Sequence, residues 1–290
     1  MKWAVLINPT AGRRPVDTER LEAALAAAGV EATLHQPADR SEMKEAALAA
    51  AIDHDLAVVG GDGTVSLIVD ALMHAAPARM PVVGILPAGT GCDLLKTFGL
   101  PSDLESAARH LAGDSTYRID VGRLDGGWGR RHFVNVAQAG VGAAAAQTAV
   151  HISRRLGPGR YPLAFAARLP RFPVADIDLR GGRGHRGKAL AVIMANAQFF
   201  AGGWNVAPKA MLVDGELDVQ VIAARKRQAF AIVPRIIKGT HLSLPEVSRM
   251  SLPSLSLHTS TPWPVEADGD YLGMTPVDAR VLPAAVQLKI

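Results

Sequence analysis

The nine residues from Val58 to Ser66, VVGGDGTVS, constrain the fold of this chain more than any other stretch. An apolar run of strand length from Leu56 leads directly into three glycines, an aspartate and a threonine, and a helical pattern begins at about Val65. Glycines let the backbone lie close to a ligand, and the free N–H groups at a helix start attract anions. The stretch therefore predicts a phosphate-binding loop, or a plain strand-to-helix turn with Asp62 near the N-cap.

Strands alternate with helices through the first 120 residues. Apolar runs of strand length lie at 3–7, 31–35, 56–59 and 82–86, and helical patterns lie at 21–28, 39–50, 65 onward and 103–112. This order predicts a mainly parallel sheet covered on both faces. Three strands run into glycine-containing loops, at Asn8 to Gly12, Gly60 to Thr64 and Pro87 to Asp93. Because parallel strands end at one edge of a sheet, we expect these loops to form one ligand crevice.

After Asp120 the pattern changes to short strands separated by Gly- and Pro-rich turns. Strand candidates lie at 133–137, 174–179, 190–195, 217–223, 247–257 and 277–282, and helix candidates lie at 143–152, 163–169 and 228–238. This half resembles an antiparallel sandwich with inserted helices. We therefore predict an α/β fold of two domains. The N-terminal α/β domain covers 1–120, which the strand 285–290 could join, and the β-rich domain covers 121–284.

Composition places the chain among globular proteins, with 49% hydrophobic and 20% charged residues in 290. A single cysteine, Cys92, excludes an intramolecular disulfide and fits a reducing cytoplasm. No apolar run reaches 18 residues. The segment 121–190 contains twelve basic residues but only three aspartates as its acidic residues. This excess of positive charge suggests an anionic partner, such as a membrane, a nucleic acid or a triphosphate. The alternative is a solvated arginine-rich surface. Of the basic residues, Arg154, Arg155, Arg160 and Arg168 lie on or near a predicted helix and could touch anionic lipid.

The motifs follow the order of a known family. They are NPTAG (8–12), GGDGT (60–64), LPAGTGCDL (86–94), DVG (120–122), the block Asn196 to Val219, KGTH (238–241) and ADGD (267–270). Together they resemble the diacylglycerol kinase catalytic domain and its bacterial lipid-kinase and sphingosine kinase relatives. NAD kinases and phosphofructokinase-like enzymes carry loops related to GGDGT, but the 196–219 block and the late ADGD favour the lipid-kinase branch.

The resemblance implies ATP in a cleft between the two domains. The residues expected to contact the nucleotide are Asn8, Pro9, Thr10, Ala11, Gly12, Gly60, Gly61, Asp62, Gly63, Thr64, Val65, Ser66 and Thr90. Backbone amides would cradle phosphate while the hydroxyls of Thr64 and Thr90 donate to it. Arg13 and Arg14 would neutralise phosphate charge, unless they are simply solvated.

Magnesium is also implied, because Mg²⁺ prefers carboxylate and phosphate oxygens. Asp62, Asp93 and Asp120 match family aspartates of a water and metal network. Asp214 matches a second metal site, in which the main-chain carbonyls of Met211 and Glu216 are ligands. This second site is either structural or catalytic, and Asp214-Gly215 also fits a β-hairpin turn.

The resemblance places the proton acceptor in ADGD. Bacterial relatives usually have DGE there, and Asp270 occupies the position of their glutamate. A carboxylate in reach of an alcohol can take its proton during attack, although aspartate is one methylene shorter and Asp268 could take part of the role. The alternative for this segment is an acidic turn. Two further departures are Cys92 in place of a family Asn, and Ser66-Leu67 in place of Asn-Glu.

We therefore predict an ATP- and Mg²⁺-dependent kinase that transfers the γ-phosphate to a lipid hydroxyl. We expect it to be cytoplasmic and in peripheral contact with anionic membrane, with no nucleic-acid partner; a homodimer is left open. The alternatives are a NAD-kinase-like enzyme that phosphorylates a soluble ribosyl hydroxyl, and a regulator that binds nucleotide or lipid with little turnover.

Overall fold

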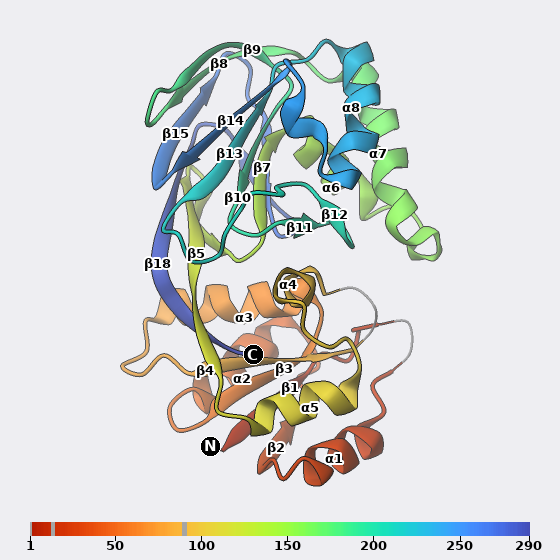
Figure 1. Ribbon diagram of the computed structural model, residues 1–290, viewed down its shortest axis with the longest axis vertical. Helices are drawn as coiled ribbons and strands as arrows, with labels where there is room; N and C mark the ends of the chain where they lie inside the picture. Colours follow the sequence, from red (N-terminus) through yellow and green to blue (C-terminus); the bar gives the residue numbers. More distant parts are fainter. Residues whose placement is uncertain (1, 13–14, 89–91) are drawn as a thin grey trace. The chain divides into compact units, whose positions relative to one another are not determined.

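The chain forms two compact units in a computed structural model that describes residues 2–12, 15–88 and 92–290 (Figure 1). Unit 1 comprises Met1–Ile119 and Ala284–Ile290, and unit 2 comprises Asp120–Pro283. Two strands, β5 (Thr116–Gly126) and β18 (Val277–Lys289), contribute residues to both units. Unit 2 is therefore inserted into the sequence of unit 1.

Unit 1 is built on a parallel sheet, as the alternation of strands and helices predicts. Its strands are β1 (Trp3–Ile7), β2 (Ala32–His35), β3 (Asp55–Gly60) and β4 (Val82–Pro87), in the order β2-β1-β3-β4. The end of β18 then pairs in parallel with β4 at Gln287 and Leu288. The last residues of the chain thus complete the sheet that the first residues begin.

Helices alternate with these strands in the described part of unit 1. They are α1 (Thr18–Ala27), α2 (Arg40–Ala50), α3 (Asp62–Ala75), α4 (Asp93–Phe98) and α5 (Leu104–Ala112). The side chains of Asp17, Asp39 and Asp103 accept backbone N–H groups at the starts of α1, α2 and α5, which satisfies donors that a helix start leaves unpaired. The helix after the glycine loop begins at Asp62 rather than at about Val65, so the aspartate lies inside its first turn.

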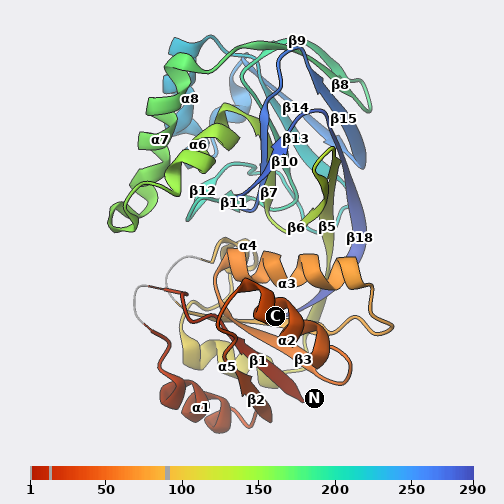
Figure 2. The ribbon, with the colours of Figure 1, turned by 180° about the vertical axis from the view of Figure 1, so that it is seen from behind.

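The two faces of the sheet are covered by different helices (Figures 1 and 2). Trp3 and Val5 of β1 pack with Leu21 of α1 and Leu111 of α5 in one buried cluster. Helices α2 and α3 contact each other, and α2 also contacts β1. A strand buried on both faces explains why β1 reads as a continuous apolar run.

Unit 2 is a β-rich sandwich, which confirms the predicted fold class. Its strands are β6 (Gly129–Phe133), β7 (Val136–Gly140), β8 (Ala175–Arg180), β9 (His185–Ala189), β10 (Ala191–Ala195), β11 (Phe199–Phe200), β12 (Trp204–Asn205), β13 (Leu217–Ile222), β14 (Val247–Leu252), β15 (Ser254–Thr259), β16 (Pro264–Ala267) and β17 (Asp270–Met274). One antiparallel sheet has the order β14-β13-β10-β7-β16-β17. The facing strands β18, β15, β8 and β9 follow one another, with β5 and β6 alongside.

The predicted single strand over 247–257 is wrong. The structure has two strands there, because Pro253 separates β14 of one sheet from β15 of the other. Proline has no N–H to donate to a ladder, so it suits the point at which a chain leaves one sheet for the next.

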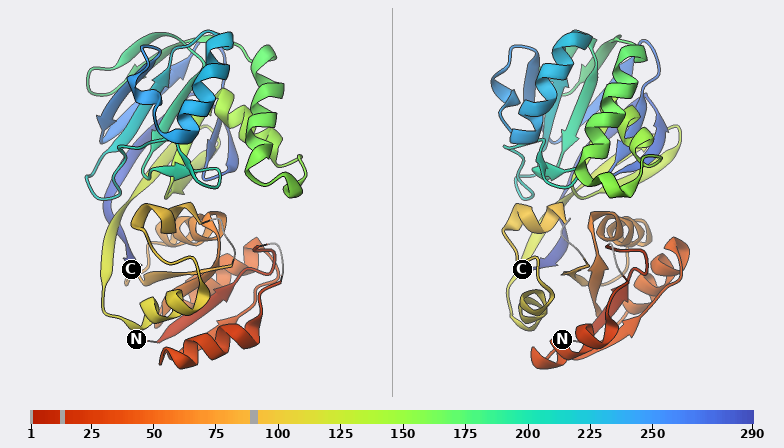
Figure 3. Two further views of the ribbon diagram at one scale, coloured as in Figure 1. Left: turned by 45° about the vertical axis from the view of Figure 1, so that its right-hand side comes forward. Right: turned by 90° about the vertical axis from the view of Figure 1, so that its right-hand side faces the viewer.

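Three α-helices lie on one side of unit 2 (Figure 3). They are α6 (Val141–Ala149), α7 (Arg160–Arg168) and α8 (Lys226–Lys238), and short 3-10 turns, η1 (Arg154–Gly159), η2 (Leu169–Arg171) and η3 (His241–Ser243), adjoin them. In the part of the chain that the structure describes, no helix is long and apolar enough to span a bilayer.

Candidate functional site

The glycine loops after β1 and β3 are joined by side-chain hydrogen bonds. Asn8 Nδ2 donates to Thr64 Oγ1 at 2.7 Å, and the backbone N–H of Asn8 donates to the carbonyl of Val59 at 3.1 Å. The Oδ1 of Asn8 accepts from both the N–H and the hydroxyl of Thr10 at 2.9 Å. Asn8 therefore fixes the turn of its own loop and the start of α3 together.

Gly60 is needed where it stands because the Thr64 side chain occupies the space beside it. A Cβ on Gly60 would lie 2.7 Å from Thr64 Oγ1 and 2.8 Å from Thr64 Cβ. A Cβ on Gly63, in contrast, would meet nothing within 4 Å. Packing against Thr64 thus requires a glycine at position 60, whereas the space beside Gly63 at the helix start is open.

Asp62 links the second glycine loop to the third. Its carboxylate accepts the backbone N–H of Asp93 at 2.8 Å and that of Leu94 at 3.0 Å, so it caps α4 from the first turn of α3. The Cys92 thiol also lies 3.5 Å from this carboxylate. Burial, together with the negative charge of Asp62, raises the pKa of Cys92 well above its usual value. The Cys92 thiol is thus a buried, packed group.

The predicted nucleotide residues lie together at one edge of unit 1, since β1, β3 and β4 are neighbours and their following loops share that edge. Ser66 is 1% exposed, which places its side chain inside the unit. Asp93 pairs with Lys96 Nζ at 3.1 Å. Thr90, Arg13 and Arg14 lie outside the described residues.

Unit 2 gathers the other predicted metal ligands around one loop. Asp120 Oδ2 accepts the N–H of Gly215 at 2.7 Å, and its own N–H donates to the carbonyl of Leu212 at 2.6 Å. Asp214 Oδ1 accepts the N–H of Glu216 at 3.1 Å. Burial raises the pKa of Asp214, and the negative charges of Glu216 and Asp120 raise it further. Crowded carboxylates of this kind fit a bound cation.

The ADGD segment forms a tight hairpin between β16 and β17. Ala267 pairs with Asp270, and the two residues between them have positive φ, 48° for Asp268 and 89° for Gly269. Positive φ at both central positions is the pattern of a type I′ turn, for which Asp-Gly is a favoured pair. The reading of the segment as an acidic turn and its reading as a functional motif are therefore both compatible with the structure.

Asp268 and Asp270 have different surroundings. The Asp268 carboxylate accepts three backbone N–H groups, from Val134 at 2.8 Å and from Asn135 and Val136 at 3.0 Å each. Asp270 Oδ2 instead accepts from Arg131 Nη2 at 2.9 Å. The Asp270 side chain is 35% exposed, whereas that of Arg131 is 10% exposed. Asp268 thus binds backbone N–H groups of residues 134–136. Asp270 is hydrogen-bonded to a side chain and is partly exposed to solvent.

A third carboxylate, which sequence reasoning missed, lies beneath the same turn. Glu266 is fully buried, and it accepts from Gln138 Nε2 at 2.7 Å and from the N–H of Gly269 at 2.8 Å. Burial raises the pKa of Glu266 to about 8. Glu266 lies outside the strands predicted from the sequence, directly before the ADGD segment, so no sequence signal marked it.

Asn196 connects the two groups of residues in unit 2. Its buried Nδ2 donates to the carbonyl of Asp120 at 2.9 Å and to that of Val134 at 2.8 Å. Val134 in turn donates to Asp268. The asparagine that opens the 196–219 block therefore ties the crowded carboxylates to the acidic hairpin.

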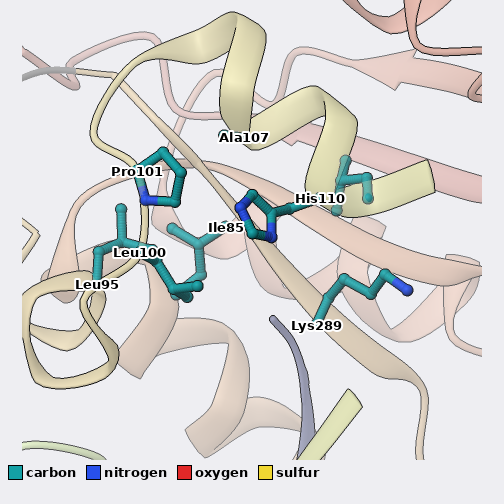
Figure 4. A pocket seen from close by; sticks show the side chains of 8 residues that line it. Ile85, Leu95, Leu100, Pro101, Ala107, His110 and Lys289 are labelled. Carbon is teal, nitrogen blue, oxygen red and sulfur yellow. The ribbon is translucent and has the colours of Figure 1, made fainter. Parts of the chain in front are cut away.

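A small hollow in unit 1 is separate from the glycine loops (Figure 4). Apolar side chains of β4, α4 and α5 line it, along with His110 and Lys289. Lys289 Nζ donates to the carbonyl of Gly113, and burial lowers the pKa of this lysine. None of the predicted site residues borders the hollow, so we assign it no part in the site.

Two family models match the chain in succession. The model described as diacylglycerol kinase catalytic domain matches residues 2–124, and that described as YegS C-terminal NAD kinase beta sandwich-like domain matches residues 135–290. A diacylglycerol kinase of Mycobacterium tuberculosis is 32% identical over 237 residues, which are 80% of this chain and 75% of that protein. A probable lipid kinase YegS-like of Stenotrophomonas maltophilia is 28% identical over 242 residues, 80% of this chain and 77% of its own length.

The fold has close relatives among solved structures. That of a diacylglycerol kinase from Bacillus anthracis superposes with a TM-score of 0.77 at 21% identity and covers 99% of this chain and 96% of its own. The fold and the matches define the class as a two-domain phosphotransferase with an alcohol group as acceptor. The chain belongs to the diacylglycerol kinase catalytic-domain family, with the C-terminal domain of its YegS-like members, which confirms the resemblance seen in the sequence.

Proposed function

We propose that this protein transfers the γ-phosphate of ATP to the hydroxyl of a lipid of the diacylglycerol, sphingoid or polyol type. The observation that carries the proposal is the accessible and oriented carboxylate of Asp270 in a chain of this family. Asp270 is the carboxylate of the acidic hairpin that is partly exposed, and a buried guanidinium orients it. A lipid hydroxyl is a weak nucleophile, and a carboxylate within hydrogen-bond reach takes its proton as the attack proceeds.

The roles proposed for the two aspartates of the hairpin follow from their partners. The carboxylate oxygens of Asp268 accept three N–H groups of residues 134–136, which supports a role for Asp268 in positioning this loop. Asp270 is then the proton acceptor, and the shortness of its side chain relative to glutamate is offset by the fixed turn that presents it.

The nucleotide loops of unit 1 supply binding and orientation. The helix start at Asp62 directs backbone N–H groups toward an anion, and the Asn8–Thr64 hydrogen bond holds two loops in register. Thr64 Oγ1 accepts from Asn8, so its hydroxyl hydrogen is available to a phosphate oxygen. Asp62 supports the third loop as a cap on α4, and its proposed share in a metal network is secondary to that role.

Mg²⁺ supplies charge neutralisation for the phosphates when it is bound. The residues proposed to hold a cation in unit 2 are Asp120, Asp214 and the main-chain carbonyls of Met211 and Glu216. The raised pKa of Asp214 supports this assignment, because burial and the charges of Glu216 and Asp120 disfavour its ionised form and a bound cation would favour it. Mg²⁺ is expected to raise the melting temperature of the wild type, and an Asp214→Asn variant should lose that increase. An equal increase in both contradicts the site.

A transfer assay tests the central proposal. Radiolabelled ATP is supplied with Mg²⁺ and, separately, with diacylglycerol, a sphingoid base, ceramide, phosphatidylglycerol and NAD. The wild type should label at least one lipid, and Asp270→Asn should lower the rate by about 10²–10⁴-fold. Labelling of NAD alone supports the NAD-kinase-like alternative, and labelling of nothing supports a regulator. An undiminished Asp270→Asn variant refutes the assignment of the proton acceptor.

We also propose that the protein works in the cytoplasm at the surface of an anionic membrane, where its lipid acceptor resides. The excess of arginine in unit 2 supports this contact.

A further inference from the structure

The basic residues of unit 2 fall into two groups once their partners are known. On the β8–β9 hairpin, Arg180 and Arg186 both pair with Asp178 at 2.9 Å. Near β5 and β6, Arg123 and Arg130 both pair with Asp125, at 2.7 and 2.9 Å. In each of these groups one carboxylate offsets the charge of one arginine. The cations of the helices form the second group.

The helical side of unit 2 is rich in cations and lacks acidic side chains of its own. Residues 126–175, which include α6 and α7, contain no Asp or Glu, and neither do residues 219–245, which include α8. Besides Lys226, whose Nζ donates to the carbonyl of Pro170, six cations lie on α7, η2 and α8: Arg160, Arg168, Arg171, Arg227, Arg235 and Lys238. Among the residues that the structure describes, none of these six forms an ion pair with a carboxylate. The side chains of Arg154 and Arg155 lie outside what the structure describes.

Many exposed positions of α7 and α8 carry apolar side chains, whereas the exposed face of a helix on a protein surface is usually polar. On α7 and the turn after it, the exposed stripe consists of Leu163, Ala166, Ala167 and Pro170. On α8 the stripe has Phe230, Ala231 and Pro234 at its centre, with cations before and after them. Leu163 is 53% exposed and Phe230 is 48% exposed.

The two helices form one connected surface. The rings of Phe165 on α7 and Phe230 on α8 meet edge to face with centroids 6.4 Å apart. Lys226 Nζ at the start of α8 donates to the carbonyl of Pro170 at 2.8 Å. In Figure 3 both helices lie at the front of unit 2 in the right-hand view. Among the described residues, Glu246 is the acidic residue that accepts a hydrogen bond from α8, from Gln228 near the first turn.

We propose that this α7/α8 surface is where the protein docks on a bilayer that contains anionic phospholipid, with Leu163 and Phe230 entering the interface and the six cations meeting the headgroups. Apolar side chains flanked by Lys and Arg, without acidic residues, match the two parts of such an interface. A nucleic acid offers the charge but no apolar layer, so it accounts for the cations only. This docking rests on the proposed function, because an enzyme that phosphorylates a lipid must reach the bilayer that contains it. It places the membrane contact on the α7/α8 surface.

Vesicle sedimentation with the full chain tests this surface. Vesicles contain phosphatidylcholine alone, or equal parts of phosphatidylcholine and phosphatidylglycerol. We expect binding to the anionic vesicles only. A charge variant, Arg171→Gln with Arg227→Gln and Arg235→Gln, should bind about a hundredfold more weakly. An apolar variant, Leu163→Gln with Phe230→Gln, should bind about tenfold more weakly.

The β8–β9 hairpin offers a control with the same loss of charge. Arg180→Gln with Arg183→Gln and Lys188→Gln should bind within about twofold of the wild type, because Asp178 already offsets part of that charge. Melting temperatures establish that each variant is folded. Equal binding to neutral vesicles, equal loss in the control variant, or no effect of the apolar variant overturns the proposal.

A second readout separates this inference from the proposed function. Phosphorylation of a short-chain diacylglycerol dispersed in detergent requires no bilayer, so the charge and apolar variants should retain the wild-type rate there. Selective vesicle binding without any transfer to lipid leaves the docking surface standing and counts against the kinase assignment alone. Transfer to lipid without vesicle selectivity counts against the docking surface alone.

Discussion

Arg131 Nη2 donates a hydrogen bond to Asp270 Oδ2 across 2.9 Å, from a side chain that is only 10% exposed. A guanidinium presents its donors in a rigid plane, so it fixes the direction of a carboxylate better than a flexible ammonium does. The Asp270 carboxylate is thus oriented by Arg131 of β6. The same strand leads into the loop whose N–H groups bind Asp268.

Loss of this guanidinium should slow transfer with little effect on nucleotide binding. We expect Arg131→Met to lower kcat by about 10–100-fold with the KM for ATP unchanged, because the base is misplaced. Arg131→Lys should restore part of the rate. The adjacent Arg130→Met, which removes an exposed partner of Asp125, is the control and should retain the rate. A kcat unaffected by Arg131→Met removes the positioning role.

Replacement of Asp268 by asparagine should destabilise the fold. An amide offers one acceptor oxygen in place of two, so at least one N–H of residues 134–136 loses its partner. A buried donor left unsatisfied costs about 1–3 kcal/mol, and urea unfolding should show a loss of this size. If Asp268→Asn abolishes transfer while its stability is unchanged, Asp268 takes part in the chemistry instead.

Glu266 should make stability depend on pH. Its folded-state pKa is raised from 4.5 to about 8 by burial, so the folded protein binds a proton that the unfolded chain releases. Its contribution is fully present below about pH 4.5 and is lost as pH rises through about 8. The full effect has an upper bound of about 5 kcal/mol.

The variant Glu266→Gln provides the comparison for this decrease in stability with rising pH. The amide is neutral at all these pH values and retains an acceptor for the N–H of Gly269. Urea unfolding at pH 5, 7 and 9 should therefore show a decline for the wild type that is absent in the variant. Parallel curves for the two proteins would falsify the assignment of the decline to Glu266.

The first and last glycines of the GGDGT loop, Gly60 and Gly63, should respond differently to a methyl group. Gly60→Ala places a Cβ 2.7 Å from Thr64 Oγ1, so Thr64 must move and its bond to Asn8 is disturbed. We expect the KM for ATP to rise about tenfold or more. Gly63→Ala meets nothing within 4 Å and adds helix propensity, so its KM should be close to that of the wild type. A similar rise in both variants contradicts the proposed role of the Gly60 packing.

The sequence predicted well where local pattern and tertiary structure agree. The buried parallel strands read as apolar runs because helices cover both faces, and the loops after them could be located by their glycines. The hairpin at Asp268 was visible for the same reason, since Asp-Gly is itself a turn signal. Whether 285–290 rejoins unit 1 could not be predicted, because strand pairing depends on the partner strand and not on the strand alone.

The parts that were missed depend on contacts between distant residues. Nothing local marks Arg131 as the partner of Asp270, which is 139 positions away. Nothing local distinguishes the two aspartates of ADGD, whose partners lie in β6 and in the loop after it. Nothing local indicates that the Asp62 carboxylate accepts the N–H groups of Asp93 and Leu94, which lie more than 30 positions later. The split at Pro253 was missed because the apolar pattern continues through the proline.

The pairing of β18 with β4 has a consequence for the order of events during synthesis. A ribosome produces β1 to β4 first, then all of unit 2, and only afterwards residues 284–290. Val286 and Leu288 are each 1% exposed, so the nascent sheet has an uncovered edge until these residues emerge. The predicted nucleotide loops, although encoded first, therefore lie on a sheet that is completed only after unit 2 has been synthesised.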